Sequence, residues 1–74
     1  MRWAIVIEGR EGNYGAYVPD LSGCVTTGDT LDEVREMMRE AIAFHLDGMR
    51  EDGDPIPDRN TRVAYVEVTA QPHP

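Results

Sequence analysis

The sequence contains a single cysteine, no lysine and no long hydrophobic run. Cys24 therefore has no partner for a disulfide bond within the chain. Two histidines, His45 and His73, without a pair of cysteines do not supply the ligands of a usual structural zinc site. The apolar stretches are far shorter than the ~20 residues of a membrane-spanning helix, and the first of them ends at Glu8, which argues against a signal peptide. These absences predict a cytoplasmic protein.

The chain is also short, since its 74 residues allow one small domain. Domains below roughly 80 residues usually gain stability from a disulfide, a bound metal or association with another chain. The first two are disfavoured by the residue counts. We therefore expect self-association to contribute to stability.

Positive charge is scarce and dispersed. Seven arginines stand against fourteen acidic residues, for a net charge of -7 and a pI near 4.5. Phosphate backbones are repelled by such a chain, so we expect no direct binding to nucleic acid. The acidity is either a solubility feature or an adaptation to a basic protein partner.

Four segments have the apolar and β-branched composition of strands. Arg2 to Glu8 is almost continuously apolar, which is typical of a central strand. Turns rich in glycine and proline connect it to Tyr14–Val18 and then to Cys24–Thr27, so these three strands should form a meander. The fourth, Arg62–Thr69, follows a helix, and a right-handed crossover would place it parallel to the first. The expected strand order is 3-2-1-4.

The helix has the best-marked boundaries. Thr30 and Glu33 form a capping box, in which the Glu33 carboxylate should accept from the Thr30 N–H. Gly53 and Pro55 should end the helix by Asp52. Apolar residues at three- and four-residue spacing predict the buried stripe: Leu31, Val34, Met38, Ala41, Ile42, His45 and Met49.

These elements predict an α+β fold with a single mixed sheet and one long amphipathic helix on one face. One helix covers only one face, whereas the first and fourth strands are apolar on both. We therefore expect a homo-oligomer, a dimer or a tetramer. The residues predicted to mediate it lie in the fourth strand: Val63, Tyr65, Val66 and Val68.

Catalytic signatures are absent. Cys24 and His45 fall on different elements, and no phosphate-binding loop or hydrolase motif is present. Glu8, Asp20 and Asp29 lie at strand ends or in loops, where acidic residues commonly stabilise turns. We therefore predict no enzyme, catalytic residue, cofactor or metal site. A vestigial RNase H-like nuclease that uses Glu8, Asp20 or Asp29 with magnesium stays open as an alternative.

Three segments together resemble the HicB-like antitoxin family: YGAYVPDLSGC at Tyr14–Cys24, GDTLDE at Gly28–Glu33 and EDGDPIP at Glu51–Pro57. The likeness extends over nearly the whole chain in the same order and spacing. Two positions depart from the family pattern, with Ser22 where proline is common and Val34 where alanine is usual. Both changes leave the expected loop and helix intact.

The resemblance implies a partial RNase H-like fold in which residues 1–70 form the antitoxin domain and 71–74 a flexible tail. It also implies a partner, a small basic HicA-like toxin that cleaves RNA and resembles a double-stranded RNA-binding domain. Because the chain stops at Pro74, no separate DNA-binding domain is expected. Tyr17, Asp20 and Asp29 are the expected toxin contacts, unless the two aspartates only stabilise turns. An orphan homo-oligomer that lacks a toxin is the other alternative.

Overall fold

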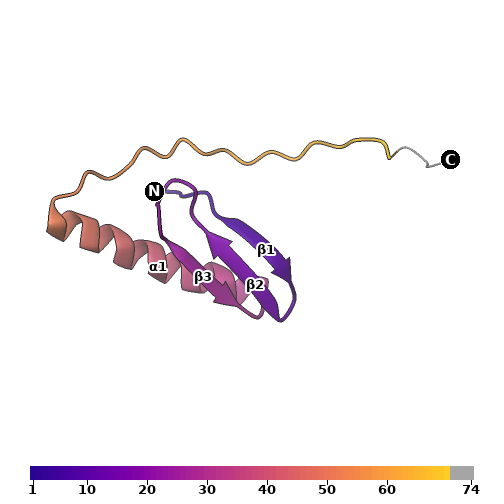
Figure 1. The fold of residues 1–74 in the computed structure, drawn as a ribbon, viewed down its shortest axis with the longest axis horizontal. Helices are drawn as coiled ribbons and strands as arrows, with labels where there is room; N and C mark the ends of the chain where they lie inside the picture. Colours follow the sequence, from indigo (N-terminus) through magenta and orange to yellow (C-terminus); the bar gives the residue numbers. More distant parts are fainter. Residues whose placement is uncertain (71–74) are drawn as a thin grey trace.

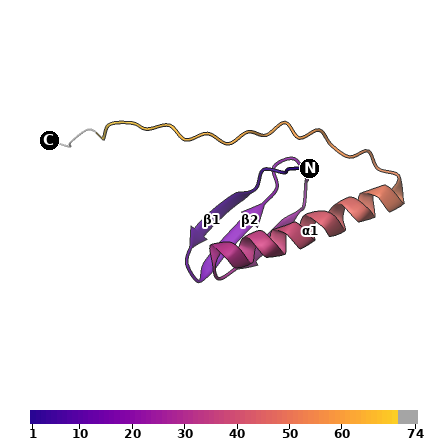
Figure 2. The ribbon, with the colours of Figure 1, turned by 180° about the vertical axis from the view of Figure 1, so that it is seen from behind.

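The computed structural model describes residues 1–70, which form three strands and one helix (Figure 1). The strands are β1 (Val6–Arg10), β2 (Asn13–Tyr17) and β3 (Val25–Gly28), and the helix is α1 (Leu31–Asp52). The helix lies along one face of the sheet, as the two opposite views show (Figures 1 and 2). The expected α+β class is confirmed. The tail expected at 71–74 lies outside the described residues.

The sheet is an antiparallel meander with the order β1-β2-β3, as predicted for the first three strands. β1 begins at Val6, later than the expected Arg2, and Val6 lies opposite Tyr17, the last residue of β2. The stretch from Arg2 to Ile5 extends past this end of β2 and therefore has no neighbouring strand to pair with. The outer edge of β1 is unpaired among the described residues.

Local capping interactions determine both ends of α1. The Thr30 side chain accepts a hydrogen bond of 3.1 Å from the Glu33 N–H, as expected. The reciprocal bond differs from the prediction, because the Glu33 carboxylate accepts from the N–H of Asp29, one residue earlier, at 3.4 Å. Gly53 ends the helix with a left-handed φ of 74°, which a glycine adopts without strain. Among the described residues, no helix is both long and apolar enough to cross a membrane.

The core lies between α1 and the inner face of the sheet. The helix contributes Val34, Met38 and Leu46, which are buried, and the predicted Ala41, Ile42 and Met49, which are partly buried and pack against the core. This corrects the expected stripe at its end, because Leu46 is 6% exposed whereas His45 is only partly buried. Leu31, the first residue of the expected stripe, is exposed. The other buried residues come from β2 and the segment that follows it: Ala16, Val18, Leu21 and Cys24.

The structure does not confirm the expected fourth strand. Residues 62–70, named here the C-terminal arm, pair with no other described segment, and every one of them is exposed. The chain returns from the end of α1 past the N-terminus and then leaves the body of the protein (Figures 1 and 2). Tyr65 is 95% exposed and Val66 83%. In this structure the arm therefore contributes nothing to the core.

Candidate partner-binding surfaces

The face of the sheet that points away from α1 carries an exposed apolar row. Side chains alternate along a strand, so the residues beside inward-facing Ala16 point outward. Val6, Tyr17 and Val25 lie directly opposite one another on the three strands and form this row. Tyr17 is 42% exposed and Val25 66%. We call this surface the outer sheet face.

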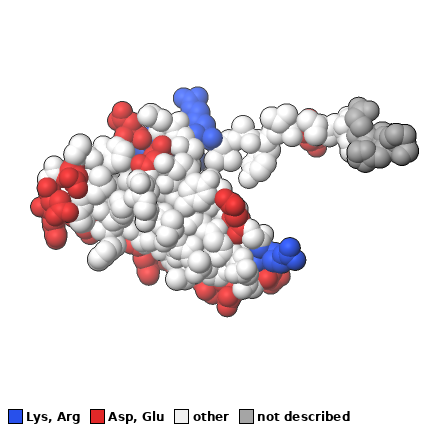
Figure 3. Space-filling view, in the orientation of Figure 1, with Lys and Arg blue, Asp and Glu red and all other residues white. Residues whose placement is uncertain are grey.

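A hollow lies next to the row, because the neighbouring position on the central strand is Gly15. Gly15 lies between Glu8 and Thr27, and no atom outside its own chain neighbours lies within 4 Å of where its Cβ would stand. The resulting depression has a volume of about 510 Å³ and is lined by residues of all three strands. Figure 3 views the molecule from this side and shows acidic groups on several sides of an uncharged centre.

The predicted contact residues do not form one cluster. Tyr17 belongs to the exposed row, whereas Asp29 follows β3 at the opposite end of the sheet. Asp20 lies in the loop between β2 and β3, where its carboxylate accepts two hydrogen bonds from Thr61, from the N–H at 3.1 Å and from the hydroxyl at 2.8 Å. Asp29 has an exposed side chain, and its carbonyl accepts from the Gly12 N–H at 2.7 Å.

The carboxylates of the alternative nuclease hypothesis, Glu8, Asp20 and Asp29, are also dispersed. Glu8 points from β1 into the outer sheet face, whereas Asp20 is engaged with Thr61. Within residues 1–70, no three histidine, cysteine or acidic side chains gather closely enough to hold a metal ion.

Cys24 is enclosed in the core. Its Sγ lies 4.0 Å from the Sδ of Met38, and burial raises the pKa of the Cys24 thiol above its ordinary value. Because the thiolate is the reactive form of cysteine, this environment makes Cys24 a poor nucleophile. A packing role agrees with its place between the sheet and α1.

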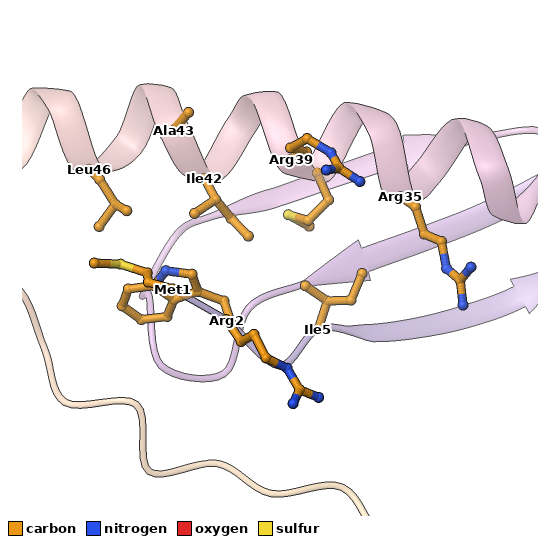
Figure 4. Close-up of a pocket in the computed structure, with 10 residues that line it drawn as sticks. Met1, Arg2, Ile5, Arg35, Arg39, Ile42, Ala43 and Leu46 are labelled. Atoms are coloured by element: carbon orange, nitrogen blue, oxygen red, sulfur yellow. The ribbon is translucent and has the colours of Figure 1, made fainter.

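A second concave surface, which the sequence reasoning did not anticipate, opens between α1 and the residues that lead into β1. This α1/β1 groove has a volume of about 590 Å³. Ile42 and Leu46 point into it from the helix, and Ile5 lies across from them (Figure 4). Its full lining comprises Met1, Arg2, Trp3, Ile5, Arg35, Met38, Arg39, Ile42, Ala43 and Leu46.

The polar groups of this groove have one feature in common: they are hydrogen-bond donors. Arg2, Arg35 and Arg39 stand at its margin (Figure 4). The Trp3 indole Nε1 is buried and has no hydrogen-bond partner among the described residues. A buried donor without an acceptor costs about 1–3 kcal/mol. The groove therefore combines an apolar floor with a buried donor, the Trp3 Nε1, that lacks a hydrogen-bond acceptor.

Comparisons with known proteins give a consistent result. A family model described as the HicB-like antitoxin of bacterial toxin–antitoxin systems matches residues 3–73. An uncharacterized 14.9 kDa protein of Haemophilus phage HP1 is 41% identical over 89% of this chain, which spans 50% of that protein. A UPF0150 protein of Archaeoglobus fulgidus is 46% identical over 73% of this chain and 83% of its own length. The protein named Antitoxin HicB 2 of Photorhabdus laumondii is 34% identical over 95% of this chain and 51% of its own length.

Proposed function

The chain belongs to the family of HicB-like antitoxins of bacterial toxin–antitoxin systems, and we propose that it neutralises a small, basic, RNA-cleaving toxin by binding it. An antitoxin of this kind acts by occupying its partner's surface and needs no catalytic group of its own. The proposed partner is a HicA-like toxin protein. We also propose that the functional protein has the partial RNase H-like sheet with the order 3-2-1-4, in which Arg62–Thr69 is the fourth strand.

The observation that carries this proposal is the uncovered outer sheet face. Protein interfaces place an apolar centre inside a polar rim, and aromatic residues are enriched at that centre. The row of Val6, Tyr17 and Val25 supplies the apolar centre, and the hollow above Gly15 supplies a recess for a protruding side chain. Glu8 borders this hollow and offers a carboxylate to a lysine or arginine of the toxin.

The charge of the chain supports a basic partner. A net charge of -7 attracts a basic protein over long range and speeds productive encounter. Carboxylates bound to the toxin's cationic surface would also occupy the positions that RNA phosphates need. Inhibition then follows from competition for the same cationic side chains.

Among the three expected contacts, we assign two different roles. Tyr17 is placed at the centre of the interface and Asp29 at its edge, because both side chains are exposed. Asp20 is half-buried and both of its carboxylate oxygens accept hydrogen bonds from Thr61. We propose that Asp20 acts by positioning the chain before the C-terminal arm.

Co-expression tests the proposal. The full chain is produced together with the product of a neighbouring reading frame that encodes a small basic protein, and growth rescue and co-purification are scored. We expect rescue by the wild-type chain and its loss with Tyr17→Asp, because a carboxylate would be buried at the centre of the interface. A toxic neighbour that the wild-type chain neither rescues nor binds would contradict the proposal.

The matched control is Phe44→Asp. Phe44 is 83% exposed and lies on α1, the layer opposite the outer sheet face. The same aromatic-to-aspartate change there should leave rescue and binding unchanged. Equal loss with both variants would show that the outer sheet face has no special role.

A further inference from the structure

The C-terminal arm has the composition of a strand but no partner strand. It alternates two sets of side chains, with Ala64, Val66 and Val68 on one side and Val63, Tyr65 and Glu67 on the other. The first set is entirely apolar. Val66 and Val68 are 83% and 84% exposed, so the arm presents one apolar row of side chains to water.

The α1/β1 groove is the complementary surface on the same chain. The free edge of β1 displays unpaired backbone N–H and C=O groups beside it. Its floor consists of Met38, Ile42 and Leu46, and the unpartnered Trp3 Nε1 requires an acceptor. A strand added at this edge would pair with the backbone of β1 and cover the apolar floor with its side chains. Its carbonyl oxygens would offer the acceptor that the Trp3 Nε1 lacks.

We infer that the C-terminal arm of one copy adds to the free edge of β1 in a second copy and inserts Ala64, Val66 and Val68 into its α1/β1 groove. The arm of the second copy binds the first copy in the same way. The exchange is therefore reciprocal and produces a closed two-fold dimer. Each sheet then has a fourth strand next to β1. Tyr65 and Glu67 then point to the side of the sheet away from α1, where they are exposed to water beside the outer sheet face.

The attachment of the arm favours a second copy over the arm's own chain. Thr61 is held by Asp20, and the Arg59 guanidinium lies 5.7 Å from the centre of the Trp3 ring and donates to the Arg2 carbonyl at 3.3 Å. These contacts hold the chain against the body up to Thr61. The arm then projects away from the body of the protein (Figure 1).

Sedimentation of the purified full chain tests the exchange without any toxin, so its outcome is independent of the proposed function. We expect a dimer, twice the 8.3 kDa chain mass, at micromolar concentration. Val66→Lys should weaken the dimer about 100-fold, because it places a charge in the apolar groove. Val66 lies outside the folded body, so the variant should keep the helical circular dichroism of the wild type. Phe44→Lys is the matched control and should remain dimeric.

Photo-crosslinking distinguishes the two possible sources of the arm. Benzoylphenylalanine replaces Tyr65 in one population, which is mixed with ¹⁵N-labelled wild-type chain and irradiated. Crosslinks from position 65 to labelled peptides from residues 1–10, which include the β1 edge, would support the exchange. Crosslinks confined to the same chain would show that the arm folds back, and a monomer or a dimer disrupted by Phe44→Lys would equally overturn the inference.

Discussion

Thr61 donates two hydrogen bonds to Asp20, which lies 41 residues earlier in the sequence. One comes from the backbone N–H and the other from the hydroxyl, so each carboxylate oxygen accepts one bond. This pairing attaches the chain to the loop between β2 and β3 directly before the C-terminal arm begins. It therefore connects that loop with the segment proposed to mediate self-association.

Replacing Asp20 with alanine should release this attachment. We expect faster amide hydrogen exchange at Thr61, because its N–H loses the acceptor. The core should keep its protection, since neither Asp20 nor Thr61 is fully buried. Asp58→Ala, at an exposed acidic residue near Thr61, serves as control and should leave the exchange rate of Thr61 unchanged. An unaltered Thr61 rate in Asp20→Ala would show that the pair does not hold the chain in solution.

Gly28 marks a close approach between β3 and α1. A Cβ at this position would lie 2.8 Å from the Val34 Cγ2, and Val34 is fully buried. Gly28→Ala should therefore destabilise the protein by about 1–3 kcal/mol in urea unfolding. Gly48→Ala is the control, because open space surrounds that position in the helix. It should stabilise the protein by about 0.5–1 kcal/mol, and equal effects of both changes would contradict the packing argument.

The helix cap offers a second stability test. Thr30→Ala removes the acceptor for the Glu33 N–H and should cost about 1 kcal/mol of unfolding free energy. Thr30→Ser retains the hydroxyl and should recover most of that loss. Thermal unfolding followed by circular dichroism measures both variants. Loss of the same size with serine would exclude the capping bond as the cause.

Cys24 should make stability depend on pH in the alkaline range. The folded thiol has a raised pKa, so the unfolded chain loses its proton first as pH rises past about 8.5. Stability from this group is fully present below that value and declines above it. The difference in unfolding free energy between the wild type and Cys24→Ala should therefore shrink from pH 7 to pH 9.5. A difference that stays constant would show that the thiol ionises equally in both states.

Sequence patterns were sufficient where the interacting residues are neighbours in the chain. Thr30 and Gly53 bound the helix as predicted, because their partners lie within a few residues. The meander of three strands was also predictable from its turns. The family resemblance, carried by contiguous segments such as Gly28–Glu33, was confirmed by the match over residues 3–73.

The candidate surfaces were only partly accessible from sequence. Tyr17 was identified as a contact, but its alignment with Val6 and Val25 depends on the register of two hairpins. The α1/β1 groove was missed, since its walls come from segments some thirty-five positions apart in the 74-residue sequence, and its opening depends on the free edge of β1. Leu46 is buried where His45 was expected, because only the packing of α1 on the sheet decides which of two neighbouring helix positions is covered.

The amino-acid sequence by itself determined the helix, the hairpins and the acidic character of this protein, because capping bonds, turn conformations and charge depend on short stretches of chain. Tertiary structure decided that Asp20 holds Thr61, that one face of the sheet stays open and that the C-terminal arm projects from the body. Those features depend on which surfaces remain uncovered after the chain has packed, and packing joins residues that no local pattern relates.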